Sequence, residues 1–247
     1  MKTTTNRTIE VLDSKSAAIA RSRVLILERL HDALKQRDRF TIALAGGSTP
    51  KPLYEALSQE SLPWSKIHIF WGDERYVPAT DKDSNQLMAR QAWLDKVDIP
   101  PSNIHPMNTT ADNPQIDAER HEAELHSFFN TRSGQFPSFD LILLGMGDDG
   151  HTASLFPHTE ALTVRDRLVT VGNKDGQPRI TFTVPLINQA RCVMFVVAGE
   201  NKRPALKEIF AEQSDDANYP SRLIQPEEEL IWLLDSSAGS GFALVER

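Results

Sequence analysis

The sequence predicts an α/β fold, in which one domain is built on a mainly parallel, doubly wound sheet with helices on both faces. Short, continuous apolar runs such as residues 139–147 and 192–199 are typical of strands that are buried on both sides. These runs alternate with segments of helical periodicity, and that alternation indicates βα units around a parallel sheet. The 247 residues contain no internal repeat, low-complexity tract or obvious linker, so we expect a single domain over residues 1–247.

The expected strands come mostly from continuous apolar runs, which suit the interior of a covered sheet. The segment RITFTVP differs, because its apolar and polar residues alternate in the manner of a strand. In chain order, the expected strands are residues 40–46, 66–72, 139–147, 168–172, 179–185, 192–199 and 229–235.

Helices are expected between these strands, and several have recognisable first residues. Asp13 or Ser14 is expected to cap the first helix, and Ser84 opens the third. Thr49, followed by Pro50, is typical of an N-cap with proline at the first helical position. The apolar face expected for the first helix contains Ala20, Val24, Leu27 and Leu34. In chain order, the expected helices are residues 14–37, 51–60, 84–96, 118–130 and 201–213.

The composition excludes several classes of protein. A formal net charge of -7 disfavours a nucleic-acid-binding protein, which normally has a basic face. No apolar run approaches the roughly 18 to 20 residues that cross a membrane, and residues 1–15 lack the apolar core of a signal peptide. The one cysteine, Cys192, lies in an apolar run and is expected to be a buried hydrophobe rather than a nucleophile. We therefore expect a cytoplasmic protein without nucleic-acid or membrane partners.

Three loops of unusual composition directly follow predicted strands, where ligands bind in open α/β sheets. The first is GGSTP (46–50), which leads into a helix N-terminus. Its glycines allow backbone N–H groups to approach an anion, and Ser48 and Thr49 add hydroxyl donors. A tight strand-to-helix turn without a ligand explains the same residues equally well. No GK[ST] sequence follows, so this is not a Walker A loop.

The second loop is WGDER (71–75), in which a strand emerges into alternating charges. Such a segment is often a solvated turn. In a functional interpretation, Arg75 binds an anionic group of the substrate, and Asp73 or Glu74 positions the substrate or transfers protons.

The third loop is GMGDDGH (145–151), which contains a formal G-x-G-x-x-G sequence. We reject a nucleotide site, because Asp148 and Asp149 would repel a pyrophosphate and Pro157 follows too soon for the long helix of such a site. The glycines instead suit a sharp loop that presents His151, which is able to take a proton from water. Asp149 is close enough in sequence to orient it. The alternative is a histidine that only caps or packs locally.

Two further cationic residues are candidates for the binding of an anionic group, although each is a weak signal by itself. Lys202 lies at the head of a predicted helix, where it is able to reach a phosphate, and Arg179 opens the strand RITFTVP. A metal site is not expected. His121 and His126 lie in HEAELH, which is one residue longer than H-E-x-x-H, so the two histidines do not share a helix face.

Together these segments resemble the 6-phosphogluconolactonase family. The resemblance covers about residues 40 to 210 and is carried by ALAGGSTPKPLYEAL, FWGDERYVPATDKDSN, FDLILLGMGDDGHTASLFP, PRITFTVPLIN and VMFVVAGENKRPAL. DGHTASLFP and WGDER are its most specific parts. The related glucosamine-6-phosphate deaminases share the architecture, but they typically have an MDE-Y segment in place of GDERY and GHIAFNEP in place of GHTASLFP.

The resemblance implies a Rossmann-like enzyme that hydrolyses 6-phospho-D-glucono-1,5-lactone, without a cofactor or metal. It implies that His151 activates water, that Asp149 orients His151, and that Arg75 assists the oxyanion or contacts the phosphate. The remaining residues expected to bind the substrate and its phosphate are Gly46, Gly47, Ser48, Asp73, Arg179 and Lys202. We expect a monomer. Two alternatives stay open, namely a deaminase in which Asp73 abstracts a proton from carbon, and a non-catalytic sugar-phosphate-binding protein.

Overall fold

The computed structural model describes residues 6–242 and 245–246 and is organised around a seven-stranded sheet with the order β10-β1-β9-β8-β5-β2-β3. The pairings among β1, β9, β8, β5, β2 and β3 are parallel, and β10 pairs antiparallel with β1. The strands are β1 (Asn6–Leu12), β2 (Phe40–Leu44), β3 (Ile67–Trp71), β4 (Asp73–Arg75), β5 (Leu141–Leu144), β6 (Val169–Lys174), β7 (Gln177–Phe182), β8 (Cys192–Val197), β9 (Glu229–Asp235) and β10 (Val245–Glu246). The predicted α/β class with a mainly parallel sheet is confirmed.

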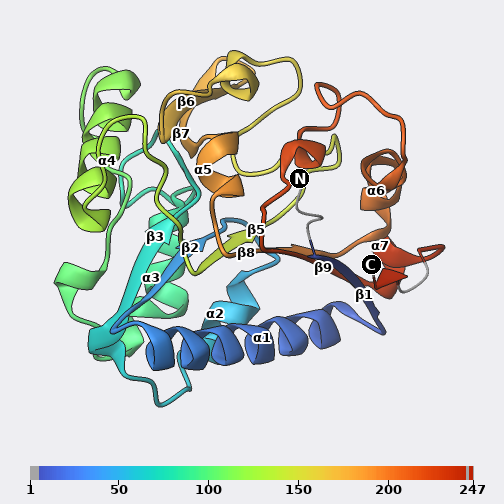
Figure 1. Ribbon diagram of the computed structural model, residues 1–247, viewed down its shortest axis with the longest axis horizontal. Coiled ribbons are helices and arrows are strands. Elements are labelled where there is room, and N and C mark those ends of the chain that lie inside the picture. The colour runs from blue at the N-terminus through green and yellow to red at the C-terminus, as the bar shows by residue number, and fades with distance from the viewer. Residues whose placement is uncertain (1–5, 243–244, 247) are drawn as a thin grey trace.

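Helices cover both faces of this sheet, as expected for a doubly wound fold (Figure 1). The helices are α1 (Lys15–Gln36), α2 (Lys51–Leu57), α3 (Asn85–Ala92), α4 (Pro114–Phe129), α5 (Val184–Asn188), α6 (Arg203–Phe210) and α7 (Ser236–Gly239). Consecutive residues of β2 belong to different cores. Ile42 is in the buried cluster that includes residues of α1, α2 and α3, whereas Ala43 is in the cluster that includes residues of α4, α5 and α6. In the described residues, no helix is long and apolar enough to span a membrane.

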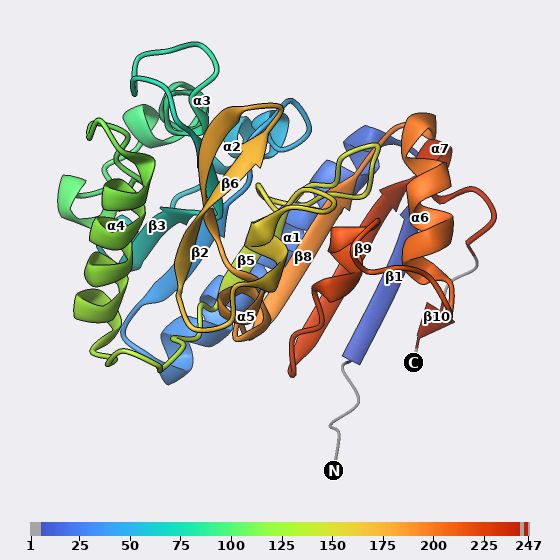
Figure 2. The same ribbon diagram turned by 90° about the horizontal axis from the view of Figure 1, so that it is seen from above.

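A second sheet stands apart from the first and has the antiparallel order β4-β7-β6. The segments 168–172 and 179–185 were both expected to be strands, and they form this separate sheet rather than part of the parallel one. The physical reason is the connection between them, because a parallel crossover needs a dozen or more residues. Asp175 and Gly176 make the turn, with φ of 53° and 85°. Two positive φ angles are typical of a tight hairpin turn. Figure 2 shows the hairpin reaching over the parallel sheet.

Several local predictions are wrong. No strand was expected at residues 6–12, yet β1 lies between β9 and β10. Thr49 does not cap α2, since that helix has Pro50 as its N-cap residue without a side-chain cap. On α1, Val24 is 41% exposed, because the apolar stripe that faces the sheet is shifted around the helix from the predicted one. The buried residues of α1 are Ala18, Ile19, Ser22, Leu25, Ile26, Leu30 and Ala33.

Candidate active site

A cavity of about 300 Å³ lies at the carboxyl ends of β2, β3, β5 and β8, and all three predicted loops reach it. Eight of the nine predicted site residues line its wall, and Asp149 is the exception. The polar and glycine residues of the lining are Gly46, Gly47, Ser48, Thr49, Gly72, Asp73, Arg75, Asn85, Gly145, Gly147, His151, Lys174, Arg179 and Lys202. Four cationic side chains and one carboxylate belong to this set. The cavity is therefore locally positive in a protein whose net charge is -7.

The loop 46–49 offers free backbone donors to this cavity. Two carbonyl groups in and beside the loop are already engaged, since Tyr54 Oη donates to Ala45 O over 2.7 Å and Lys15 Nζ donates to Ser48 O over 3.3 Å. Within the described part of the chain, no hydrogen bond engages the N–H groups of residues 46–49. Gly47 has a φ of 93°, which L side chains rarely adopt. Free N–H groups that precede a helix suit an anion such as a phosphate.

Arg75 and Arg179 are directly opposite each other in the antiparallel pair β4–β7. Like charges in that position are unfavourable without a counter-ion. Burial, and then the charge of Arg75, lowers the pKa of the Arg179 guanidinium. Arg75 Nη1 donates to Asp83 O over 2.6 Å, which fixes its direction, while its buried Nε has no hydrogen-bond partner among the residues that the structure describes. The pair is therefore prepared for an anionic group between or beside the two guanidiniums.

The carboxylates of the two acidic residues of WGDER have different partners. Asp73 lines the cavity, and its Oδ2 accepts a hydrogen bond of 2.6 Å from Ser154 Oγ. Glu74 is 3% exposed and binds the start of α3, where it accepts hydrogen bonds from the N–H groups of Asn85 and Gln86 at 2.7 and 2.8 Å. Burial raises the pKa of Glu74. The suggestion that Glu74 positions the substrate or transfers protons is not supported by this geometry, because its carboxylate is occupied by the helix.

His151 and Asp149 form a hydrogen-bonded pair within the third loop. The distance from His151 Nδ1 to Asp149 Oδ1 is 2.6 Å, and this hydrogen bond lowers the pKa of Asp149 to about 2. The carboxylate is thus charged near neutral pH and holds Nδ1 as the protonated nitrogen. No hydrogen bond in the described residues engages Nε2 of His151, whose ring lies beside Phe156 with centroids 4.5 Å apart. Nε2 is therefore available as a proton acceptor.

The backbone around His151 is tightly constrained. An added Cβ at Gly147 would lie 2.1 Å from His151 Nδ1, so only glycine fits there. Thr152 Oγ1 donates to Gly145 O over 2.8 Å and closes the loop on itself. Ala153, which lines the cavity, has a φ of 47°. A non-glycine residue in that region is strained, and such strain is concentrated at functional sites.

Lys202 reaches the cavity but is paired in this structure. Its ammonium group contacts Asp148, which also accepts a hydrogen bond of 2.9 Å from Asn201 Nδ2. The hydrogen bond from Lys202 lowers the pKa of Asp148. An anion that binds Lys202 would therefore replace Asp148 as the charged partner of its ammonium group.

Sequence reasoning missed two polar residues of the cavity wall. Lys174 comes from β6, and its ammonium lies 5.9 Å from the centre of the Phe156 ring. Asn85 is the first residue of α3. The hairpin signal Asp175-Gly176 beside Lys174 was visible in the sequence, whereas nothing local pointed to Asn85.

Comparison with known proteins gives consistent results over nearly the whole chain. A family model described as "Glucosamine-6-phosphate isomerases/6-phosphogluconolactonase" matches residues 13–232. The chain is 64% identical over 234 residues to the 6-phosphogluconolactonase of Nostoc sp., which covers 95% of this chain and 98% of the relative. It is 63% identical over 231 residues to the 6-phosphogluconolactonase of Synechocystis sp., which covers 94% and 96%.

Solved structures resemble the fold closely. The 6-phosphogluconolactonase from Trypanosoma cruzi has a TM-score of 0.87 at 30% identity, and the match covers 98% of both chains. A monomeric glucosamine-6-phosphate deaminase has a TM-score of 0.79 at 19% identity, with 94% of this chain and 98% of that one covered. The latter similarity concerns the fold alone.

Proposed function

Because the chain belongs to the family of glucosamine-6-phosphate isomerases and 6-phosphogluconolactonases, we infer that it is a hydrolase that converts 6-phospho-D-glucono-1,5-lactone to 6-phospho-D-gluconate. This reaction belongs to the oxidative pentose phosphate pathway. The observation that carries the inference is the identity of 64% over nearly the full length of a relative that has this name. The locally positive cavity supports it independently, since the substrate has a dianionic phosphate.

We propose that His151 is the general base. Nε2 of His151 takes a proton from water while the water oxygen attacks C1 of the lactone. The carbonyl oxygen becomes an oxyanion in the tetrahedral intermediate. The C1–O5 bond then breaks, and the proton returns from Nε2 to the ring oxygen that leaves. Asp149 keeps the other proton on Nδ1 and stabilises the charged imidazole, in the manner of a carboxylate that orients a catalytic histidine.

The substrate is proposed to bind with its phosphate against the free N–H groups of residues 46–49. Arg179 and Lys202 supply positive charge there, and Ser48 adds a hydroxyl donor. Arg75 stands beside Arg179 and either shares the phosphate or stabilises the oxyanion at C1. Asp73, held by Ser154, is proposed to position a sugar hydroxyl group.

The remaining proposals concern the state of the protein. We propose that residues 1–247 form one domain and that the protein is a cytoplasmic monomer. We expect no cofactor, metal or nucleic-acid partner. These statements rest on the composition and motifs of the sequence, and size measurement in solution tests the oligomeric state.

The direct experiment is an assay with freshly prepared lactone in weakly buffered solution, in which acid release is followed with and without enzyme. Acceleration above the spontaneous opening is expected. Release of ammonia from glucosamine 6-phosphate would identify a deaminase instead. Calorimetric binding of 6-phosphogluconate without any acceleration of lactone opening would identify a non-catalytic binding protein.

A further inference from the structure

We propose that Asn85 is a positioning residue of the active site. It holds the backbone of the loop 46–49 in the position from which the N–H groups of the loop bind the phosphate. The kinetic part of this inference rests on the proposed function, because it concerns the binding of the same substrate. Asn85 acts through Gly46 and through the strand that carries Asp73, and it makes no contribution to the chemical step.

The position of Asn85 is fixed from two directions. It lies in the cavity wall with 2% of its surface exposed. Its backbone N–H donates to Glu74 Oε1 over 2.7 Å, and its side-chain Nδ2 donates to Asp73 O over 2.9 Å. Asn85 is thereby tied to β4, which also carries Arg75. A side chain anchored at both ends has one available direction.

That direction brings the amide against Gly46. An added Cβ at Gly46 would lie 1.8 Å from Asn85 Oδ1, 2.2 Å from Cγ and 2.6 Å from Nδ2. The amide of Asn85 therefore occupies the space that a side chain at position 46 would need. This close approach explains why position 46 is glycine, whereas the neighbouring Gly47 is explained by its φ of 93°.

The same amide has an unpaired acceptor. Asn85 Oδ1 is buried and has no hydrogen-bond partner among the described residues. A buried acceptor without a partner is destabilising, and an apolar side chain of similar size would avoid that cost. Packing alone therefore does not account for an amide here. The hydrogen bond from Asn85 Nδ2 to Asp73 O fixes the orientation of the amide plane, and thereby the way in which the amide contacts Gly46.

The consequence for the substrate follows from the loop. Tyr54 also holds the residue just before the loop, through its hydrogen bond to Ala45 O, so Asn85 and Tyr54 together limit the movement of the loop. Without the Asn85 amide, the backbone at Gly46 is free to settle toward α3. The N–H groups of residues 46–49 would then move away from the phosphate. This weakens ground-state binding, and it leaves the His151–Asp149 pair unchanged.

The test compares Asn85→Ala with Asn103→Ala. Asn103 is a second buried asparagine, and its Nδ2 donates to Ile67 O over 3.0 Å at the amino end of β3, whereas the cavity lies beyond the carboxyl end of that strand. Both variants are expected to lower Tm. Asn85→Ala is expected to raise KM for the lactone and the calorimetric Kd for 6-phosphogluconate about tenfold, with kcat within about twofold. Asn103→Ala is expected to leave KM and Kd unchanged.

A second measurement uses the contact itself. Gly46→Ala is expected to raise KM at least as much as Asn85→Ala, because its methyl group must displace the amide. In the double variant the methyl group has room, so Gly46→Ala is expected to add little to the effect of Asn85→Ala. Gly46→Ala also supplies a result if Asn85→Ala does not fold.

Three outcomes would overturn the proposal: an unchanged KM in Asn85→Ala or Gly46→Ala, an equal rise of KM in Asn103→Ala, or effects of the two active-site changes that multiply. Failure of the proposed function looks different. In that case the wild-type protein does not accelerate lactone opening, and the titrations with 6-phosphogluconate still measure the effect of Asn85 on binding.

Discussion

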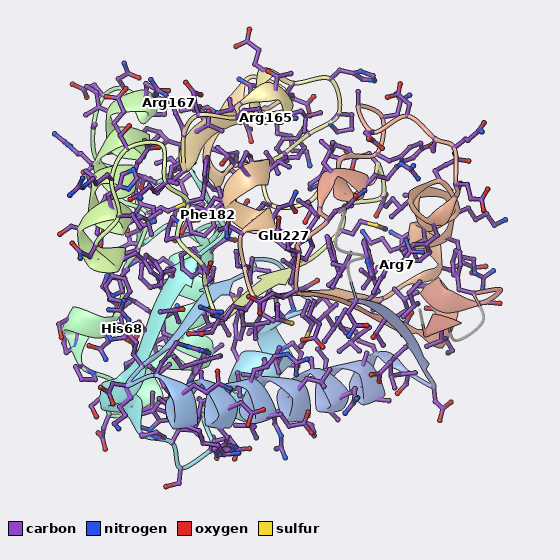
Figure 3. The ribbon with its side chains drawn as sticks, in the orientation of Figure 1. Arg7, His68, Arg165, Arg167, Phe182 and Glu227 are labelled. Atoms are coloured by element: carbon purple, nitrogen blue, oxygen red, sulfur yellow. The ribbon has the colours of Figure 1, made fainter. Side chains whose placement is uncertain are left out.

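Two of the histidine–carboxylate pairs among the described residues are similar in distance and different in surroundings. His151 Nδ1 lies 2.6 Å from Asp149 Oδ1 at the edge of the cavity. His105 Nδ1 lies 2.9 Å from Glu124 Oε1 between β3 and α4. The second pair is packed among aromatic rings, and Phe70 stacks on His105 with centroids 4.3 Å apart. Figure 3 shows His68, the neighbour of His105, near the β3 side of the sheet.

The difference lies in the second ring nitrogen. Nε2 of His105 is engaged, because it lies 3.2 Å from His68 Nδ1. Nε2 of His151 has no hydrogen-bond partner among the described residues, and its ring lines a cavity with four cations. A carboxylate partner is therefore not what makes a histidine suitable for catalysis. A free nitrogen that faces room for a substrate is the distinguishing property.

The largest expected effect is that of His151→Ala. If His151 is the general base, as proposed, its loss should lower kcat roughly 10²- to 10⁴-fold, while substrate binding remains. His105→Ala is the matched change in the other pair, and it should lower Tm with kcat unchanged. Initial rates, corrected for spontaneous opening, and thermal unfolding measure both. Near wild-type kcat in His151→Ala would contradict the base role.

The next effect concerns the carboxylates. Asp149→Asn removes the acceptor that keeps the proton on Nδ1, and kcat should fall roughly 10- to 10²-fold, less than for His151→Ala. Glu124→Gln should change stability alone, because Glu124 has no contact with the cavity. If the two variants lost equal activity, the distinction between the pairs would be wrong.

A smaller effect is expected for binding at Lys202. Lys202→Ala should raise KM about tenfold and leave kcat nearly unchanged, since the lysine is proposed to bind the phosphate in ground and transition states alike. Lys207→Ala is the control, because Lys207 lies on α6, which begins directly after Lys202 in the chain, and it does not line the cavity. An unchanged KM in Lys202→Ala would show that the phosphate lies elsewhere.

The smallest effect is a pH dependence of stability at His68, which lies beside the His105–Glu124 pair. Burial, then His105, then Arg39, lowers the pKa of His68 to about 4. In the unfolded chain the pKa of a histidine is about 6.5, so between these values the unfolded state binds a proton that the folded state does not. The free energy of unfolding should therefore decrease as the pH falls through this window. Urea unfolding at several pH values should show a weaker decrease for His68→Gln, and equal curves for both proteins would contradict the assignment.

Much of the fold was accessible from the sequence because buried strands and amphipathic helices have strong patterns. β1 was missed, since Arg7 and Glu10 interrupt its apolar residues. The separate antiparallel sheet was missed because each of its strands was considered alone, although Asp175-Gly176 carries a hairpin signal.

The lining of the cavity was predictable where single motifs supply it, and eight of the nine named residues line the cavity. The role of Asn85 was not predictable, because its contact with Gly46 depends on how the first residue of α3 meets the distant loop 46–49. The pairing of Lys202 with Asp148 likewise depends on tertiary structure, since the two residues are 54 positions apart.

The most direct test of the central claim is a double-mutant cycle between His151 and Asp149, with kcat of each variant corrected for spontaneous lactone opening. If Asp149 acts through His151, the double variant Asp149→Asn/His151→Ala will be no slower than His151→Ala alone. If the two losses multiply, Asp149 acts independently of His151, and the account of the pair as one catalytic unit is wrong.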